Sequence, residues 1–242
     1  MTALLAIEGL YKQFGGLTAV SDVMFSVEEG EIVALLGPNG SGKTTVLNMI
    51  SGALVPTAGH IRLAGAEIAG LAPHRIAHRG VARTFQLVRI LPSLTVRENV
   101  VAALAFRQNG LWGTDAERQA DALLEEVGLI GRGGEKADDL TYIDQKRMEL
   151  ARALAAEPRL LLLDEWLSGL NPTELRVGID LILSLRQRGM TILLVEHIME
   201  AVRALCTRAV VMNAGAIIAD GPTVAVLAEP DVVRAYLGEA DA

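Results

Sequence analysis

Three apolar runs of strand length set the fold class of this chain. They are "EIVALLG" (31–37), "RLLLLDE" (159–165) and "MTILLVEH" (190–197), and each is almost unbroken in Val, Ile and Leu. A strand that is apolar at successive positions is buried on both faces, as in a parallel sheet covered by helices. Helical patterns separate the runs, including "NPTELRVGIDLILSLRQRG" (171–189), which opens with Asn-Pro and closes on Gly. The alternation predicts a doubly wound α/β core.

The two ends of the chain show a second kind of strand pattern. Residues 4–36 and 60–68 predict short strands joined by turns, which indicates an antiparallel β part near the N-terminus. The segment "AVVMNAGAIIADG" (209–221) predicts a hairpin that turns at Asn213–Gly215. We therefore expect antiparallel elements at the edges of the parallel core.

The middle of the chain is predicted to be helical, because the strand signal fades between about Leu87 and Glu157. The segment "TDAERQADALLEEVG" places Thr114 and Glu117 at the spacing of a capping box and ends on Gly128. A helical subdomain inserted in the core is the simplest arrangement of this stretch.

We expect one domain that spans residues 1–242. Residues 1–86 and 158–242 would form the core with its β part, and residues 87–157 would form the helical subdomain. A chain of this length is sufficient for such a domain with a sizeable core.

Charge and cysteine content exclude several classes of protein. The net charge is −7 with Lys and Arg scattered along the chain, so a basic stripe for nucleic acid is not expected. The single cysteine, Cys206, excludes an internal disulfide and a metal site built from cysteines, and it fits a reducing cytoplasmic compartment. The first sixteen residues lack the basic start and long apolar run of a signal peptide, and no stretch reaches the roughly 18 apolar residues of a membrane span. Any membrane association would then come through a partner.

The segment "GPNGSGKTT" (37–45) matches the pattern G-x-x-x-x-G-K-[ST] between a predicted strand and a predicted helix. Its glycines let the backbone curl so that successive N–H groups point at phosphate oxygens, and the following helix N-terminus adds partial positive charge. Lys43 would neutralise the β- and γ-phosphates, and the Thr44 hydroxyl could bind Mg²⁺. The alternative, an ordinary glycine turn, does not account for the lysine and threonine together.

Two acids follow the second apolar run. Asp164 and Glu165 lie where the strand ends, and ligands bind at the carboxyl ends of strands in open α/β sheets. Asp164 would hold Mg²⁺ directly or through water, and Glu165 would orient the attacking water as general base or positioner. Taken alone the pair could be a solvated turn, but with the phosphate loop it predicts the second half of one site.

Four further features narrow the class. Gln86 lies in "ARTFQ", "LTYIDQKRMELARAL" (140–154) precedes the acidic strand, "LSGLNP" (167–172) follows the acids, and His197 lies in "VEHIM". In this order and spacing the whole chain resembles an ATP-binding cassette (ABC) transporter ATPase. The resemblance implies a P-loop NTPase core of the RecA-like type, with an N-terminal antiparallel β part and an inserted α-helical subdomain.

The resemblance extends to the ATPase subunits of branched-chain amino acid importers. The segments "ARTFQLVRILPSLTVRENV", "SGLNPTE" and "PDVVRAYLGE" carry it. Many ABC ATPases have a leucine-proline pair before the glutamine, where this chain has Thr84-Phe85.

The resemblance also assigns roles to single residues. Phe14 would stack on adenine, although a phenylalanine packed in the core at a strand end is the alternative. Gln86 would reach Mg²⁺ or the attacking water, and His197 would contact the γ-phosphate and link it to Glu165. Ser168–Asn171 would cross the interface of a head-to-tail dimer, in which each ATP lies between the phosphate loop of one chain and the signature segment of the other.

The family signature Leu-Ser-Gly-Gly-Gln aligns with Leu140–Asp144, which holds no glycine. Thr141 keeps a hydroxyl for the γ-phosphate. Ile143 keeps the backbone N–H of the second glycine, but a β-branched residue strongly disfavours positive φ and adds methyls near the phosphate. Either the backbone stays in an allowed region and the site works, or this half-site is degenerate. We hypothesise that the chain's own phosphate loop is competent and its signature weakened.

Trp166 stands where the family has proline after the two acids, and we expect it to pack in the core or at an interface.

The residues expected at the site bind the nucleotide, take part in catalysis or hold Mg²⁺. The residues expected to bind the nucleotide are Phe14, Gly37, Pro38, Asn39, Gly40, Ser41, Gly42, Lys43, Thr44, Thr45, Thr141, Ile143 and Asp144. Those expected to take part in catalysis are Lys43, Gln86, Glu165 and His197, and those expected to hold Mg²⁺ are Thr44, Gln86 and Asp164.

The resemblance implies an ATP-hydrolysing subunit of an importer, bound at the cytoplasmic face of the bacterial inner membrane. Its implied partners are integral-membrane permeases, a second ATPase subunit in a hetero- or homodimer, and indirectly a periplasmic solute-binding protein. The alternatives are the ATPase of another ABC transporter (urea, aromatic acid or lipopolysaccharide), a soluble ABC protein acting on nucleic acid or ribosomes, and a nucleotide-binding regulatory subunit without turnover.

Overall fold

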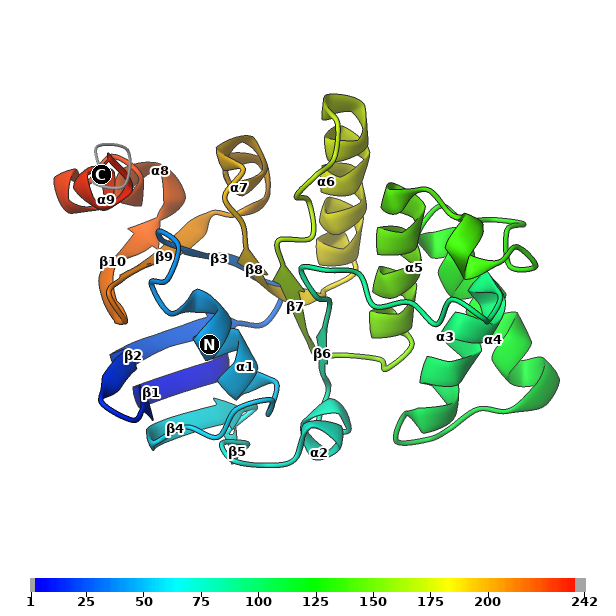
Figure 1. The fold of residues 1–242 in the computed structure, drawn as a ribbon, viewed down its shortest axis with the longest axis horizontal. Helices are drawn as coiled ribbons and strands as arrows, with labels where there is room; N and C mark the ends of the chain where they lie inside the picture. Colours follow the sequence, from blue (N-terminus) through cyan, green and yellow to red (C-terminus); the bar gives the residue numbers. More distant parts are fainter. Residues whose placement is uncertain (1–2, 238–242) are drawn as a thin grey trace.

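The computed structural model describes residues 3–237 and places them in two sheets flanked by helices (Figure 1). A six-stranded sheet in the order β10-β9-β3-β8-β7-β6 forms the core, and a four-stranded sheet in the order β2-β1-β4-β5 lies beside it. Strands β6, β7, β8, β3 and β9 run parallel, and β10 pairs antiparallel with β9. The strands of the core sheet are β3 (Ile32–Leu36), β6 (Val81–Arg83), β7 (Leu160–Asp164), β8 (Thr191–Val195), β9 (Arg208–Asn213) and β10 (Ala216–Pro222).

The unbroken apolar runs are explained by burial on both faces of the core sheet. Every residue of β3, β7 and β8 is buried. Along β3 the side chains alternate between two hydrophobic clusters, since Ile32 and Leu36 belong to one and Val33 and Leu35 to the other. The first cluster continues into the helices that follow β6 and β7, and the second into the antiparallel sheet and the helix after the phosphate loop. The predicted α/β core is therefore confirmed.

The antiparallel sheet is built from β1 (Ala3–Phe14), β2 (Leu17–Glu28), β4 (Ala58–Leu63) and β5 (Ala66–Glu67). The expectation of short strands in this part is wrong for β1 and β2, which have 12 residues each. Irregular pairing between these two strands interrupts the strict alternation that would have marked them as long. The last part of the same stretch, β3, belongs to the parallel sheet, as the apolar run at 31–37 predicted.

The hairpin predicted for residues 209–221 is confirmed as β9 and β10. Its turn consists of Ala214 and Gly215, both with positive φ (45° and 84°), as hairpin turns of two residues require.

The chain between β6 and β7 is helical, with α3, α4 and α5 grouped at one end of the molecule (Figure 1). A capping box of Thr95 and Glu98 starts α3. The capping box predicted at Thr114 is wrong, because α4 already begins at Gly113 and its N-cap residue, Trp112, makes no side-chain hydrogen bond. The elements of this region are α3 (Val96–Phe106), α4 (Gly113–Glu126), the 3-10 turn η1 (Ala137–Asp139) and α5 (Tyr142–Leu154).

The remaining helices connect strands within the core sheet, connect the two sheets, or follow β10. They are α1 (Lys43–Ile50), α2 (Pro73–Ala77), α6 (Pro172–Gln187), α7 (Met199–Leu205), α8 (Thr223–Val226) and α9 (Pro230–Leu237). The predicted start of α6 is confirmed, since Asn171 caps it and Pro172 is its first residue. Within residues 3–237, none of the helices combines the length and the apolar character needed to cross a membrane.

Candidate active site

The carboxyl ends of four parallel strands bring the phosphate loop, Gln86, the two acids and His197 to one edge of the core sheet. Asp164 ends β7 opposite Val195 of β8, and Leu35 of β3 pairs with the same Val195. Arg83 ends β6 beside Leu162 of β7. The loops that leave these strands, which begin at Gly37, Thr84, Glu165 and Glu196, therefore start side by side.

The phosphate loop depends on glycine at particular positions. Gly37, Gly40 and Gly42 have φ of 141°, 74° and 106°. A Cβ at Gly37 would lie 2.1 Å from the Met212 carbonyl oxygen, and one at Gly42 would lie 2.7 Å from the Ala19 carbonyl oxygen. The loop therefore needs glycine for its backbone conformation and for the close approach of two other segments of the same chain.

Lys43 begins α1 and turns back over the loop. Its Nζ donates to the carbonyl oxygens of Gly37 and Pro38 at 2.7 Å and lies 3.4 Å from Ser41 Oγ. The ammonium group is thereby held at the mouth of the loop, where it can meet an arriving phosphate. Thr44 is exposed beside it, Thr45 and Asn39 lie in the same segment, and Ser41 is buried.

Two contacts from distant parts of the chain hold the phosphate loop in place, and neither was predicted from the sequence. The Gly37 N–H donates to the Tyr236 hydroxyl of α9 at 2.8 Å. The Gly215 N–H of the β9–β10 turn donates to the Ser41 carbonyl at 3.0 Å. The loop is thus supported from the C-terminal part of the fold.

Glu165 lies at the centre of the candidate catalytic cluster. Its backbone has φ of 49°, a left-handed conformation that is uncommon outside glycine and concentrates at functional sites. Its N–H donates to the Val195 carbonyl at 2.8 Å, which ties β7 to β8. Gln86 Nε2 donates to Glu165 Oε2 at 2.8 Å, and His197 Nδ1 lies 3.8 Å from the same oxygen. Three residues from separate loops thus meet at one carboxylate.

Asp164 faces a cation that the sequence analysis missed. Arg83 Nη2 donates to Asp164 Oδ2 at 2.7 Å, and both side chains are only 7% exposed. An arginine three residues before the glutamine was the available signal, but β6 is too short to have been recognised as a strand that ends beside β7.

A single cavity of about 690 Å³ includes the side chains expected to hold Mg²⁺. Thr44, Gln86 and Asp164 all line it. Hydroxyl, amide and carboxylate oxygens are hard donors of the kind Mg²⁺ prefers, so this donor set fits the metal.

Phe14 is the last residue of β1 and is 46% exposed, with Lys12 Nζ 5.1 Å from its ring centre. This exposure disagrees with the alternative of a core phenylalanine and leaves one ring surface for an aromatic ligand.

The signature segment begins α5 and is held by charged side chains. Thr141 is the N-cap residue, and its hydroxyl donates to Asp144 Oδ2 at 2.7 Å. Asp144 also pairs with Arg132 at 2.6 Å and with Arg147 at 3.0 Å. Burial raises the pKa of the Asp144 carboxyl, but the Thr141 hydrogen bond and the two guanidiniums outweigh it, so this pKa lies below its ordinary value.

Ile143 lies in the first turn of α5 and does not belong to the residues with positive φ. Its side chain is 8% exposed, so its methyls pack inward rather than extend from the helix N-terminus. The backbone conformation thus agrees with the interpretation in which the segment stays in an allowed region of φ and ψ. The backbone N–H of Ile143 is retained.

Trp166 packs beneath the signature helix. It is fully buried, its indole N–H donates to the Lys146 carbonyl at 3.1 Å, and Lys146 Nζ donates to the Trp166 carbonyl at 2.8 Å. Above this pair lies Tyr142, whose ring centre is 4.9 Å from Lys146 Nζ. The expectation of core packing for Trp166 agrees with this position.

The structure does not bring the signature segment to the chain's own phosphate loop. In Figure 1, β6 and β7 lie between α5 and α1. The signature segment at the start of α5 therefore lies in a second, separate region.

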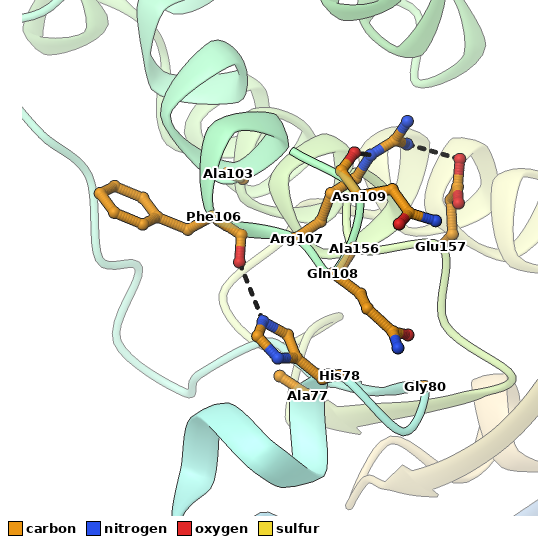
Figure 2. Close-up of a pocket in the computed structure, with 10 residues that line it drawn as sticks. All are labelled: Ala77, His78, Gly80, Ala103, Phe106, Arg107, Gln108, Asn109, Ala156 and Glu157. Atoms are coloured by element: carbon orange, nitrogen blue, oxygen red, sulfur yellow. Dashed lines mark hydrogen bonds and ion pairs between the residues drawn. The ribbon is translucent and has the colours of Figure 1, made fainter. Parts of the chain in front are cut away.

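A smaller cavity of about 290 Å³ lies where α2 meets the end of α3 (Figure 2). His78 Nε2 donates to the Phe106 carbonyl at 3.2 Å across it, and Arg107 pairs with Glu157 at its far side. None of the predicted site residues lines this cavity.

Comparison with known proteins decides the family. The ABC transporter family matches residues 20–168, which contain the phosphate loop, the signature segment and the two acids. The chain belongs to the ABC transporter family. It is 43% identical over 251 residues to the high-affinity branched-chain amino acid transport ATP-binding protein BraF of Pseudomonas aeruginosa, with 98% of each chain covered. It is also 37% identical over 237 residues to the lipopolysaccharide export system ATP-binding protein LptB of Haemophilus influenzae, again with 98% of each chain covered.

Among solved structures, the chain resembles the ADP conformation of MJ1267, an ATP-binding cassette of an ABC transporter. The TM-score is 0.90 at 30% identity, covering 98% of this chain and 100% of the other. The ABC cassette thus has the P-loop NTPase fold expected from the sequence, and a cassette of this fold binds nucleotide.

Proposed function

We propose that this ABC ATPase hydrolyses ATP to drive an importer of branched-chain amino acids. The observation that carries the proposal is the meeting of Gln86, Glu165 and His197 beside the phosphate loop. The solute class rests on the 43% identity with BraF over 98% of both chains.

The proposed chemistry uses the groups already described. The backbone N–H groups of residues 37–45 and the Lys43 ammonium bind the β- and γ-phosphates of ATP. Glu165 orients the attacking water and accepts its proton, while Gln86 and His197 hold the Glu165 carboxylate in place. Phe14 stacks on the adenine.

Thr44, Gln86 and Asp164 are the residues proposed to hold Mg²⁺, since they line one cavity. When bound, Mg²⁺ neutralises charge on the phosphates.

Dimerisation follows from the separation of the two nucleotide-facing surfaces. Because α5, which begins with the signature segment, lies apart from α1 and the phosphate loop (Figure 1), the segment would complete a site on a second ATPase. Ser168–Asn171 would cross that interface. ATP would close the dimer and hydrolysis would reopen it. The backbone at Ile143 stays in an allowed region, but the segment Leu140–Asp144 holds no glycine. Within such a dimer we therefore propose that this chain supplies a competent phosphate loop and a weakened signature.

The exposed segment that follows Gln86, rather than the part of the cavity lined by Thr44 and Asp164, is the proposed docking place of a permease helix. Phe85, Leu87 and Arg89 line the cavity, and Leu87 is 79% exposed. We propose that residues 87–157 act as a subdomain that moves against a core of residues 1–86 and 158–242. A chain docked in this way would lie at the cytoplasmic face of the inner membrane, with a periplasmic solute-binding protein on the other side.

A lipopolysaccharide transporter is the second candidate, because LptB of Haemophilus influenzae is 37% identical to this chain. Its lower identity makes it the weaker one.

The test is to isolate the complex from its native membranes. We would tag the chain, change Glu165→Gln to trap the ATP-bound state, purify it with MgATP and identify the co-purifying proteins by mass spectrometry. Two permeases with a different ATPase are expected for a heterodimeric importer. Permeases with copies of this chain alone would mean a homodimer, in which the Ile143 signature must support hydrolysis. The absence of any membrane subunit would overturn the transporter proposal.

A further inference from the structure

Arg83 is a cation with a buried side chain beside the candidate metal site. It ends β6, its side chain is 7% exposed, and its Nη2 donates to Asp164 Oδ2 at 2.7 Å. Arg83 and Asp164 both line the cavity that contains Thr44 and Gln86. The Arg83 guanidinium therefore contacts the Asp164 carboxylate inside the candidate site. No role was predicted for Arg83 from the sequence.

The same guanidinium also reaches the helix that follows the phosphate loop. Its Nη1 donates to Asn48 Oδ1 at 2.6 Å and lies 3.2 Å from Ser51 Oγ, and both residues belong to α1 or its C-cap. A planar guanidinium presents its donors in a rigid fork, so it fixes two partners relative to each other. Arg83 thus links the acid of β7 to α1.

Stability alone is a weak reason for this arrangement. A buried ion pair loses hydration energy that its mutual attraction often only balances. The Arg83 Nε is buried and, among residues 3–237, has no hydrogen-bond partner, so the guanidinium is not placed where its own donors are best satisfied.

We propose that Arg83 is a positioning residue, which holds the Asp164 carboxylate in the orientation that receives Mg²⁺ and keeps it in register with α1. The inference rests on the proposed function, in which Asp164 is a magnesium ligand. Removing a group that orients a metal-binding side chain typically lowers metal affinity about 10- to 100-fold. The opposite expectation also has a physical basis, because a cation beside the site repels Mg²⁺ and its removal would strengthen metal binding.

The experiment measures metal-dependent nucleotide binding instead of turnover. The full-length chain is titrated with a fluorescent non-hydrolysable ATP analogue in EDTA and again in excess Mg²⁺. The ratio is the dissociation constant in EDTA divided by the dissociation constant in Mg²⁺. It reports how strongly the protein favours the metal-bound nucleotide.

Three variants and one control sharpen the result. Arg83→Met removes the cation, Arg83→Lys keeps the charge without the fork, and Asn48→Ala removes the α1 partner alone. Arg107→Met is the control, because Arg107 is also largely buried at 12% exposure and ion-paired, with Glu157, but lies at the other cavity.

We expect Arg83→Met to lower the ratio about tenfold, while the dissociation constant in EDTA stays within about twofold of wild type. Arg83→Lys and Asn48→Ala should give intermediate ratios, and Arg107→Met the wild-type ratio. Thermal unfolding identifies any variant that fails to fold. If Arg83→Met does not fold, the ratios of Arg83→Lys and Asn48→Ala test the inference. An unchanged or higher ratio in folded Arg83 variants would overturn the inference. A wild-type ratio near one would instead overturn the magnesium site of the proposed function.

Discussion

In the proposed dimer, the phosphate loop and the signature segment of this chain each complete a nucleotide site with the partner ATPase, yet they are built in different ways. The loop is shaped by backbone freedom, with glycines at positive φ and a lysine bound to loop carbonyls. The signature segment has no glycine, and its shape comes from a hydroxyl, a carboxylate and two guanidiniums that bind one another. A loop of the first kind can adjust to a phosphate. A segment of the second kind is set in advance by side chains that already have partners.

The largest expected effect concerns Trp166, which packs against the helix of the signature segment. It follows Glu165 in the chain and packs on Lys146 of the signature helix. Trp166→Ala should cost about 3–5 kcal/mol of folding free energy because it empties a fully buried site. Thermal unfolding should show a fall of about 10 °C in Tm, since ~1 kcal/mol corresponds to about 2–4 °C at this chain length. Trp112→Ala, at a 68% exposed tryptophan, is the control and should leave Tm almost unchanged. Equal effects of the two substitutions would contradict the buried packing of Trp166 against the signature helix.

The next effect tests the phosphate loop. Lys43→Met should lower the ATPase rate of the assembled complex at least about 100-fold, because one charged donor at developing negative charge is worth about 10²–10³ in rate. Steady-state phosphate release measures it, with Lys136→Met in the helical region as the control. A rate within tenfold of wild type would mean that the phosphate loop of this chain is not the one that supports hydrolysis in the complex.

A smaller effect is expected from the carboxylate of the signature segment. Asp144→Asn weakens two ion pairs and a charged hydrogen bond, and hydrogen bonds to charged groups contribute about 1.5–3 kcal/mol each at most. We expect Tm to fall by about 5 °C at pH 7.

The pH dependence gives this prediction a sign. The pKa of the Asp144 carboxyl is below its ordinary value of 3.8 in the folded chain, so its stabilising contribution is complete above that value and is lost as pH falls through the lower folded pKa. The difference in Tm between wild type and Asp144→Asn should therefore shrink on acidification below about pH 4. A difference that stays constant from pH 7 to pH 3 would contradict the ion-paired state of Asp144.

The smallest effect would decide between the two interpretations of the signature. If Ile143 weakens this half, Ile143→Gly should raise the ATPase rate of the assembled complex about threefold, equivalent to ~0.7 kcal/mol of transition-state stabilisation. Ile143→Ala shortens the side chain but keeps the helical preference, and it should act in the same direction. An unchanged rate in Ile143→Gly would end the hypothesis of a weakened signature.

The parts of this molecule that follow local rules could be predicted from the sequence. The runs at 31–37, 159–165 and 190–197 predicted buried parallel strands because burial on both faces removes polar alternation. The glycines of the loop were informative because their spacing reflects backbone conformation. The antiparallel strands were underestimated because irregular pairing hides their length.

Long-range partners were not predictable in the same way. Arg83 meets Asp164 81 residues away, and Gly37 meets Tyr236 199 residues away. Both contacts depend on strand order and register, which no local pattern encodes. The short strand β6, with three residues, gave too little signal to place Arg83 at the sheet edge.

The hydrogen bond between Gly37 and Tyr236 has a consequence for biosynthesis. A ribosome completes the phosphate loop early, but the hydroxyl that binds its first N–H is added 199 residues later. Nascent chains and truncated products that lack α9 therefore carry a loop without this support. A quality-control factor that recognises a phosphate loop without this hydrogen bond would distinguish such chains from the finished protein.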